Sequence, residues 1–387
     1  MKHPHILSLL ALMLVFSLAA GACGLRPNVT EPSPAEVNAA PTPDAVSPEP
    51  TEMPATAEPA SSVSEPSPAP TADSFPAGPF NPLTGEPADE DCIRLRPVAV
   101  MVENNHAAGM IAQAGISRAD ILIEFQTEQI TRNMALFMNI GDVPAIYPVR
   151  SARSYFASAA MAFDAIFVHA GRSDNGVENS TSVLQHFTDH DDIDLLEGDY
   201  SYRMQDWPHI GEHGLATTGQ LLTDAFTALG TRREHKTDAF DNGLRFRENA
   251  APVDGEPAES IRIVFPGGKT MELRFDAEKN GYTGYQWDTP YADDNTGERV
   301  VFQNVLVIDA PTEVGADEYY SSVITTTDVN GEGYFFNGGF AEKVTWSRGG
   351  LDTPFRFFGP DGTELTLGVG HSYIAFVSPD IGGASFS

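Results

Sequence analysis

The sequence predicts an α+β protein, in which an α/β layered domain is followed by a β-rich domain. Between residues 81 and 249, apolar strand-like runs alternate with helical runs, as in a layered α/β unit. From residue 250 to residue 387, short alternating runs recur between turn residues, which indicates strands and hairpins. Residues 24–80 are rich in proline and poor in large apolar residues, so we expect them to precede the folded part.

The first 23 residues have the pattern of a bacterial lipoprotein signal peptide. Lys2 precedes an apolar stretch at residues 6–20, and small residues then lead into Cys23. A basic start, an apolar run of about 7–15 residues and small residues before the cleavage site make a secretory signal. We therefore expect lipidation of Cys23, with an acyl group such as palmitate, and a lipid-anchored position on the extracytoplasmic face of the cell membrane. An ordinary signal peptide with an incidental cysteine and a short transmembrane anchor are the alternatives.

Residues 24–80 are expected to form a disordered acidic tether. This segment contains 14 of the 29 prolines and carries eight acidic residues against one basic residue. The whole chain has a formal net charge of −31 at pH 7. Nucleic acid is therefore not an expected partner, because phosphate binding needs an excess of Lys and Arg. If Cys23 carries lipid, only Cys92 remains, and no intramolecular disulfide can form.

The region from 81 to 249 shows four predicted strands and three predicted helices. Buried-type apolar runs predict strands at 96–103, 119–125, 134–140 and 165–169. Helical spacing of apolar residues predicts helices at 150–164, 176–187 and from 217 or 218 to 229, with Gly230 as a stop. We expect these elements to alternate in one layered unit.

The region after residue 250 is expected to be mainly β. Alternating apolar runs predict strands at 261–265, 271–275, 282–287, 300–308, 322–326, 334–336, 343–346, 354–358, 364–367 and 372–377. The pairs Asn330-Gly331, Gly338-Gly339 and Asp361-Gly362 have the composition of hairpin turns. Whether this region is a separate domain or shares a sheet with the first half cannot be read from the pattern.

The motifs of common cofactor and metal sites are missing from the sequence. It contains no phosphate loop, dinucleotide fingerprint, nucleophile elbow or zinc-protease motif. The acidic stretches at 293–298 and 328–331 lack complete calcium-ligand spacing, and His186 and His190 fit a polar helix end better than a metal site. We therefore expect no cofactor and no metal, and an enzyme is less expected than a binding protein.

Two arginines at the predicted start of the helix at 150–164 form the first candidate site. Arg150 and Arg153 would lie in its first turn, where the helix dipole disfavours cations. Together with free backbone N–H groups, their guanidinium groups would make an anion site. The alternative is that nearby Asp or Glu side chains pair with these arginines in structural ion pairs.

A second group of polar residues lies around the carboxyl ends of predicted strands. His169 ends a buried strand, and Ser173 follows in the loop before the next helix. Ligands usually bind at such loops in α/β sheets. Glu124, at the end of another strand, and Arg132 could join this edge or form a structural ion pair of their own.

The sequence resembles the YerB-like bacterial lipoproteins, a family defined by domains of unknown function. The resemblance rests on stretches along nearly the whole folded part. They are Asn81 to Gly85, Arg96 to Asn104, Gln113 to Asp120, Glu124, Thr131-Arg132, Pro148 to Arg153, Val168 to Gly171, Glu212 to Leu215, Asn304-Val305, Phe336 to Gly338, Val344 to Ser347 and Gly362 to Leu367, with Gly370. The resemblance implies an N-terminal α/β region, a β-rich C-terminal region and a membrane location, and it implies no activity. Tyr291 and Ala216 stand where the family commonly has a histidine and an aromatic residue.

These observations favour a non-catalytic envelope lipoprotein that binds an anionic small molecule or a cell-wall component. Its predicted ligand-binding residues are Arg132, Arg150, Arg153, His169, Ser173 and His213. One alternative is an envelope hydrolase or transferase that uses His169 or His213 as general base, with Glu124 as partner. Another is a scaffold that engages a protein partner through the β-rich domain.

Overall fold

A computed structural model describes residues 78–105, 112–128, 130–205, 211–237, 240–265, 268–316, 321–380 and 382–387. These residues belong to one compact unit that comprises Ser67–Ser387. The predicted signal peptide with Cys23, and the predicted tether up to residue 77, lie outside the described residues.

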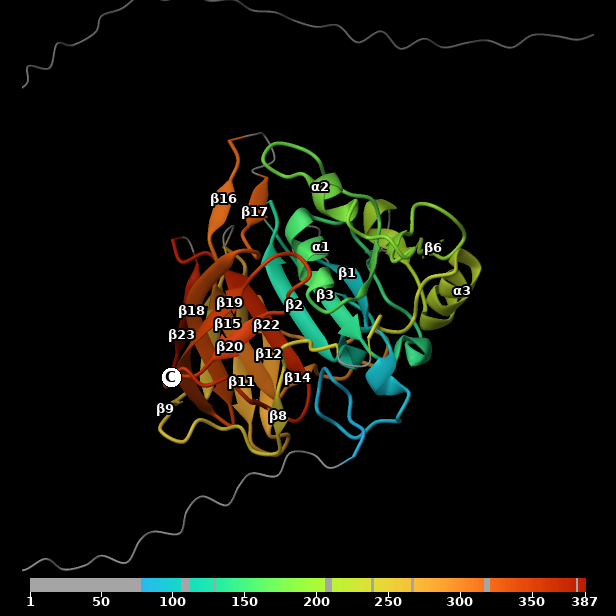
Figure 1. Ribbon diagram of the computed structural model, residues 1–387. Coiled ribbons are helices and arrows are strands. Elements are labelled where there is room, and N and C mark those ends of the chain that lie inside the picture. Colours follow the sequence, from blue (N-terminus) through green and yellow to red (C-terminus); the bar gives the residue numbers. More distant parts are fainter. Residues whose placement is uncertain are drawn as a thin grey trace, which may run out of the picture. The chain divides into compact units, whose positions relative to one another are not determined.

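One large sheet contains strands from both halves of the chain (Figure 1). Its strands are, in spatial order, β20 (Arg356–Phe358), β19 (Phe340–Arg348), β18 (Val329–Asn337), β15 (Asn304–Asp309), β22 (Ser372–Val377), β2 (Ile121–Gln126), β3 (Thr131–Phe137), β1 (Val98–Asn104), β4 (Ile166–His169) and β5 (Asp192–Asp194), with β9 (Glu256–Pro257) beside β19. The strand β22, near the end of the chain, pairs in parallel with both β15 and β2. The two halves therefore share a sheet, which crosses the predicted boundary at residue 249; the division into two domains stays a prediction.

The central strands of this sheet are buried on both faces. Every residue of β1, β2, β3 and β22 is buried. Strands covered on both faces need apolar residues throughout rather than in alternation. This explains why runs such as Ile121–Gln126 could be recognised as strands in the sequence.

A second sheet covers one face of the first. It consists of β13 (Thr289–Pro290), β12 (Gly281–Gln286), β11 (Thr270–Asp276), β10 (Ser260–Val264), β23 (Gly383–Phe386) and β14 (Val301–Phe302). Ile261, Met271 and Tyr282 from this sheet share one apolar core with Val100 and Leu122 of the large sheet. Smaller pairs are formed by β16 (Thr312–Val314) with β17 (Ser322–Ile324), β21 (Leu367–Gly368) with β8 (Phe246–Arg247), and β6 (Tyr202–Arg203) with β7 (Leu215–Ala216).

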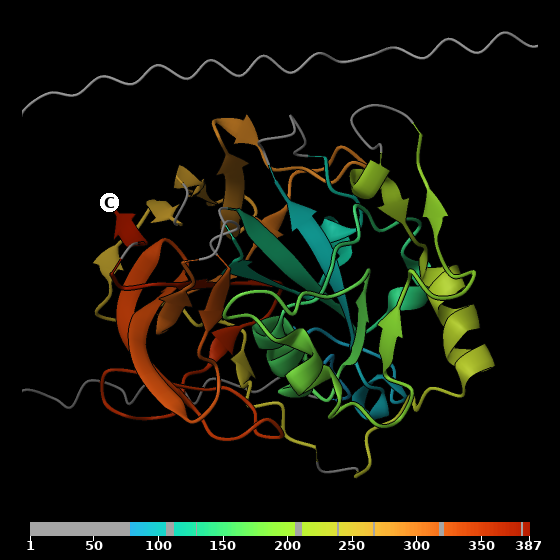
Figure 2. The same cartoon turned by 90° about the horizontal axis from the view of Figure 1, so that it is seen from above.

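The helices lie beside the strands of the N-terminal half (Figure 2). They are α1 (Ser154–Met161), α2 (Ser180–Leu184) and α3 (Gly219–Leu229), together with the short 3₁₀ helices η1 (Cys92–Arg94), η2 (Ile116–Arg118), η3 (Ile140–Asp142) and η4 (Gly211–Gly214). The helix α1 also contacts β17 and β19 of the C-terminal half. Phe156 and Ala160 of α1 pack in the core on the opposite face from the second sheet. None of the helices in the described ranges is long and apolar enough to cross a membrane.

The prediction for α3 was confirmed, whereas that for α1 was wrong at its start. The side chain of Thr218 caps α3, and Gly230 ends it in the left-handed conformation. The helix α1 begins at Ser154 rather than at residue 150. The reason is that the N–H of Arg150 donates to Met101 O and that of Ala152 to Gly171 O, which keeps this segment extended beside β1. Only Arg153, as N-cap residue, lies at the helix start.

Of the predicted hairpin turns, Gly338-Gly339 joins β18 to β19, and both residues have positive φ. The turn predicted at Asn330-Gly331 was wrong, because both residues lie inside β18. A Cβ at Gly331 would come within 2.5 Å of Trp346 Nε1 and 2.6 Å of Asp309 O, so this glycine permits close packing rather than a turn. As predicted, the fold is a mixed α+β structure rich in strands.

Candidate functional site

The pairing of the strands brings the predicted site residues to one edge of the large sheet. β1 runs parallel to β4 and antiparallel to β3, which in turn is antiparallel to β2. The carboxyl ends of β1, β2 and β4 therefore meet the start of β3 at the same edge. Glu103, Gln126 and His169 lie at those ends, and Arg132 is the second residue of β3. Such an edge is the usual binding position in open α/β sheets.

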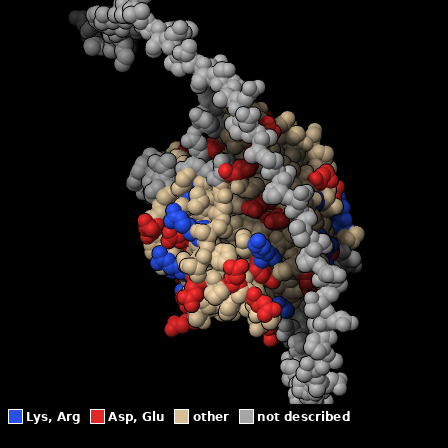
Figure 3. Space-filling model, turned by 90° about the vertical axis from the view of Figure 1, so that its left-hand side faces the viewer, with Lys and Arg blue, Asp and Glu red and all other residues tan. Residues whose placement is uncertain are grey.

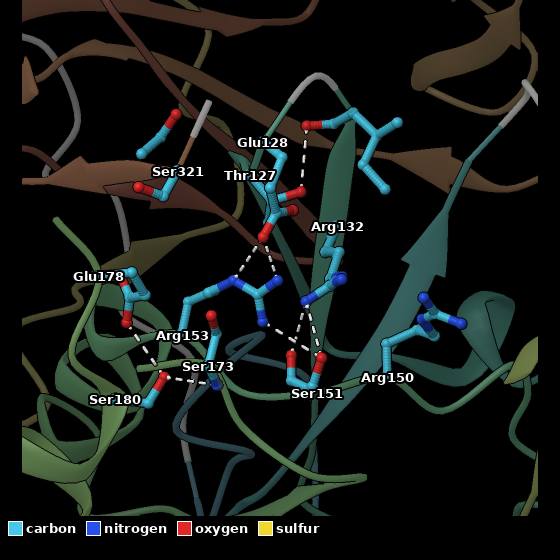
Figure 4. Close-up of polar contacts among 12 residues, drawn as sticks. Thr127, Glu128, Arg132, Arg150, Ser151, Arg153, Ser173, Glu178, Ser180 and Ser321 are labelled. Atoms are coloured by element: carbon cyan, nitrogen blue, oxygen red, sulfur yellow. Dashed lines mark hydrogen bonds and ion pairs between the residues drawn. The ribbon is translucent and has the colours of Figure 1, made fainter. Parts of the chain in front are cut away.

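Arg132 and Arg153 lie against each other at this edge (Figure 4). The hydroxyl oxygen of Ser151 accepts a hydrogen bond of 3.2 Å from Nη1 of each arginine. Ser151 O accepts a further bond of 2.9 Å from Arg132, and Ala152 O one of 2.8 Å from Arg153. Two guanidinium groups are thus fixed on one serine, an arrangement that needs an anion to offset their repulsion.

Arg132 is the least compensated cation in this pair. Its side chain is almost fully buried, and its Nε has no hydrogen-bond partner among the described residues. Burial, and then the charge of Arg153, lower the pKa of Arg132 to about 9, while Arg150 adds a smaller effect of the same sign. The protonated form of Arg132 would therefore be stabilised by a further anion.

Glu128 supplies the negative charge that faces these two arginines. Its Oε1 accepts hydrogen bonds from Arg153, one from Nε at 2.9 Å and one from Nη2. Burial alone would raise the pKa of Glu128, but the charges of Arg153 and Arg132 outweigh it and hold this pKa at about 2. Glu128 lies on the connection between β2 and β3, where the N–H of Thr127 donates to Ile130 O. Its side chain remains 24% exposed.

The amino end of α1 already carries an anion of the protein itself. Glu178 accepts hydrogen bonds from the backbone N–H of Ser154 at 2.6 Å and from its hydroxyl at 3.0 Å. Ser180 donates a third bond of 3.0 Å to the same carboxylate. Burial raises the pKa of Glu178, against the effect of these hydrogen bonds. The helix N-terminus predicted to be open to a ligand is therefore occupied.

Arg150 and His213 belong to a neighbouring group around Glu103. The Nδ1 of His213 lies 2.7 Å from Glu103 Oε2, and Arg150 Nε lies 3.7 Å from Glu103 Oε1. Arg150 also donates to the backbone oxygen of Glu212. His213 is thus oriented by a carboxylate through one ring nitrogen, as histidines are in many acid–base sites. Glu103, rather than the predicted Glu124, provides this partner.

His169 is held in the interior and does not join the arginines. Its Nδ1 lies 2.8 Å from Gly171 O, and its Nε2 lies 2.6 Å from Asp192 Oδ1. The N–H of Ser173 donates to the Ser180 hydroxyl at 3.4 Å, and the N–H of Ser180 donates to Ser173 O at 2.9 Å. The predicted site residues His169 and Ser173 are therefore not joined by a hydrogen bond among the described residues.

Glu124 belongs to a separate buried network on the other face of the sheet. Its carboxylate forms an ion pair with Lys269, accepts a bond of 3.0 Å from Asn104 Nδ2, and accepts another of 2.6 Å from Tyr373. Burial lowers the pKa of Lys269, while Glu124 acts against this. Tyr291 lies nearby and accepts a hydrogen bond from Asn133. This network joins the first half of the chain to β11.

Sequence reasoning missed the acidic members of the site, Glu103, Glu128, Glu178 and Asp192. Glu103 and Glu128 follow or end strands whose carboxyl ends share the same edge, so the rule that identified Arg132 and His169 could have found them. Glu178 and Asp192 gave no such signal, because Glu178 lies in the loop before α2 and Asp192 is the first residue of the short strand β5. Nowhere in the described ranges do three or more His, Cys, Asp or Glu side chains form a group able to hold a metal ion.

On the face shown in Figure 3, the Lys and Arg side chains are interspersed with Asp and Glu side chains. Cations on the second sheet are paired, since Arg262 and Arg274 both contact Glu272. Both arginines are about half exposed, so water screens their charge, whereas Arg132 and Arg153 are buried. These arginines therefore provide a natural contrast with Arg132 and Arg153.

Comparison with known proteins identifies relatives of this chain. Residues 83–231 match the profile of the N-terminal domain of a protein of unknown function, DUF3048, and residues 261–374 match that of its C-terminal domain. The Bacillus subtilis (strain 168) protein named "Putative lipoprotein YerB" is 29% identical over 315 residues, which cover 79% of this chain and 88% of that protein. The crystal structure of YerB from Bacillus subtilis matches with a TM-score of 0.65 and 26% identity, and it covers 80% of this chain and 100% of that one. This chain therefore belongs to the DUF3048 family, whose N- and C-terminal domains follow each other along its folded part.

Proposed function

We propose that the protein is a membrane-anchored envelope lipoprotein that binds an anionic ligand or cell-wall component at the carboxyl edge of its large sheet. The observation that carries this proposal is Arg132. A guanidinium group that is almost fully buried, has an unpartnered Nε and lies beside Arg153 is costly unless an anion compensates it. Protein interiors rarely leave such groups unsatisfied without a functional reason.

The anchor part of the proposal rests on the sequence around Cys23 and on the name of the Bacillus subtilis relative. Growth with labelled palmitate should give a labelled protein in the membrane fraction. Replacement of Cys23 by Ser should remove the label and release the protein from that fraction. A Cys23→Ser protein that keeps the label would rule out lipidation at this residue.

The binding part is tested with purified peptidoglycan sacculi in a cosedimentation assay. Replacing Arg132 by Gln, or Arg150 and Arg153 together by Ala, should lower the sedimented fraction at least tenfold. The matched control replaces Arg262 and Arg274 by Ala, since these arginines are about half exposed and pair with Glu272. That control should sediment like the unaltered protein.

A thermal melt of each variant separates binding from stability. If the arginine variants lose binding and melt near the temperature of the unaltered protein, the arginines serve a ligand. If they bind sacculi normally and melt far below it, these residues are structural ion pairs, and the proposed function is wrong.

An acid–base enzyme is the second candidate, because Glu103 orients the imidazole of His213 through Nδ1. Orientation by a carboxylate stabilises the imidazolium that forms when histidine accepts a proton. Hydrolysis of peptidoglycan fragments that is lost in both His213→Ala and Glu103→Gln would favour this candidate. Absence of turnover with the unaltered protein would eliminate it for these substrates.

A further inference from the structure

We propose that Glu128 is a built-in substitute for the ligand, and that the ligand presents a carboxylate that takes its place against Arg153 and Arg132. This inference rests on the proposed anion site; it specifies a carboxylate as the ligand class and competition with Glu128 as the regulation of the site. The side chain of Glu128 then acts as an internal competitor, which leaves the arginines when the ligand arrives.

The contacts of Glu128 are those expected for a bound carboxylate. One edge of the Arg153 guanidinium, Nε and Nη2, faces its Oε1, while Nη1 is held by Ser151 and Ala152. The negative charge of Glu128 acts on both Arg153 and Arg132. Arginine recognises planar carboxylates through such an edge, with more specificity than a point charge allows.

Among Glu103, Glu128 and Glu178, Glu128 is the carboxylate that can leave most easily. Its side chain is 24% exposed, whereas that of Glu103 is 1% exposed. Glu178 is also buried, and its carboxylate caps the N-terminus of α1 through Ser154. Glu128 contacts arginine through a single oxygen, and the backbone hydrogen bond that its carboxylate accepts comes from its own residue rather than from a helix end. By contrast, removing Glu178 would leave the Ser154 N–H without its acceptor.

Departure of Glu128 leaves a strongly cationic position. Arg153 would lose its anion, and Arg132 would still have an unpartnered buried Nε. An incoming carboxylate restores the hydrogen bonds of Arg153 and replaces the negative charge that Glu128 supplied to both arginines. The net charge of the site is therefore the same with Glu128 bound and with the ligand bound, which makes the exchange low in electrostatic cost.

The test follows the side-chain Nε–H signals of arginine by NMR while acetate or inorganic phosphate is added. Glu128→Gln removes the competing charge at nearly constant shape, so its Kd for acetate should be at least tenfold lower than that of the unaltered protein. The matched control is Glu272→Gln, because Glu272 also contacts two arginines and is 23% exposed. It should leave acetate binding unchanged.

Three results would overturn the inference. Equal acetate affinity in Glu128→Gln and the unaltered protein would show that Glu128 does not compete. Tighter binding of phosphate than of acetate by Glu128→Gln would contradict the carboxylate class. Binding of acetate by Glu128→Gln that survives Arg153→Ala would place the anion elsewhere. If neither anion binds any variant, and sacculi are not bound either, the proposed function itself has failed, so the two failures can be told apart.

Discussion

The buried ion pair between Lys269 and Glu124 offers the sharpest test of what holds the two halves together. Their side chains are 3% and 0% exposed, and Lys269 immediately precedes β11, whereas Glu124 lies in β2. Replacing Lys269 by Met leaves a buried carboxylate without its cation. Removing one partner of a buried pair typically costs about 3–5 kcal/mol.

The surroundings of Glu124 place the expected cost at the lower end of that range. The carboxylate keeps its hydrogen bonds from Asn104 at 3.0 Å and from Tyr373 at 2.6 Å. Hydrogen bonds to charged groups are each worth about 1.5–3 kcal/mol, so they stabilise part of the uncompensated charge. We therefore expect Lys269→Met to lower the free energy of unfolding by about 3 kcal/mol.

Urea unfolding followed by the fluorescence of the buried Trp346 measures this change. Adding Glu124→Gln to Lys269→Met removes the unpaired charge, so the double variant should be more stable than the single one by about 1–2 kcal/mol. Lys279→Met serves as control, because its contact with Asp276 is exposed and should contribute less than about 1 kcal/mol. Loss of less than about 1 kcal/mol in Lys269→Met, or simple additivity in the double variant, would refute the reasoning.

Three further predictions concern single positions. The pKa of Glu128 is about 2 in the folded protein and about 4.3 in an unfolded chain, so its contribution to stability is present above pH 4.3 and is lost as the pH falls towards 2. The urea midpoint of Glu128→Gln should therefore fall less steeply across this pH window than that of the unaltered protein. Gly331→Ala should lower the free energy of unfolding by about 1–3 kcal/mol, since its Cβ would collide with Trp346 and Asp309 O, and an unchanged melting temperature would contradict that packing. Burial, aided by Asp120 and Asp89, raises the pKa of Cys92 to about 11, so peptide mass spectrometry should find slow alkylation at pH 7 in the folded protein and fast alkylation in urea.

Local sequence signals were sufficient to predict an element whose ends are marked by capping residues. Thr218 and Gly230 mark α3 with a cap and a left-handed end, and both were read correctly. The start of α1 was misread because the residues before Ser154 are held extended by bonds to Met101 and Gly171. Those partners are distant in sequence, and helical spacing carries no information about them.

The candidate site was predictable only in part for the same reason. Arg150 and Arg153 could be chosen because cations are unusual at a predicted helix start, and Arg132 because it could join the carboxyl edge of the predicted strands. Which carboxylate faces which arginine depends on how the strands are arranged. The pairing of Glu128 with Arg153 therefore could not be predicted, and Glu124 was assigned to an edge from which it points away, towards Lys269.

The position of β22 determines when the large sheet can be completed. Tyr373 and Glu124 lie in the neighbouring strands β22 and β2 but are separated by 249 residues. Nearly the whole chain is therefore synthesised before β22. Until then β2 and β15 each present an unpaired edge, and exposed edges of this kind pair readily with other chains. Contacts over such separations also slow folding. A chain cut short before β22 would thus lose more than its C-terminal residues: it would leave a gap in the middle of the sheet that supports the arginines.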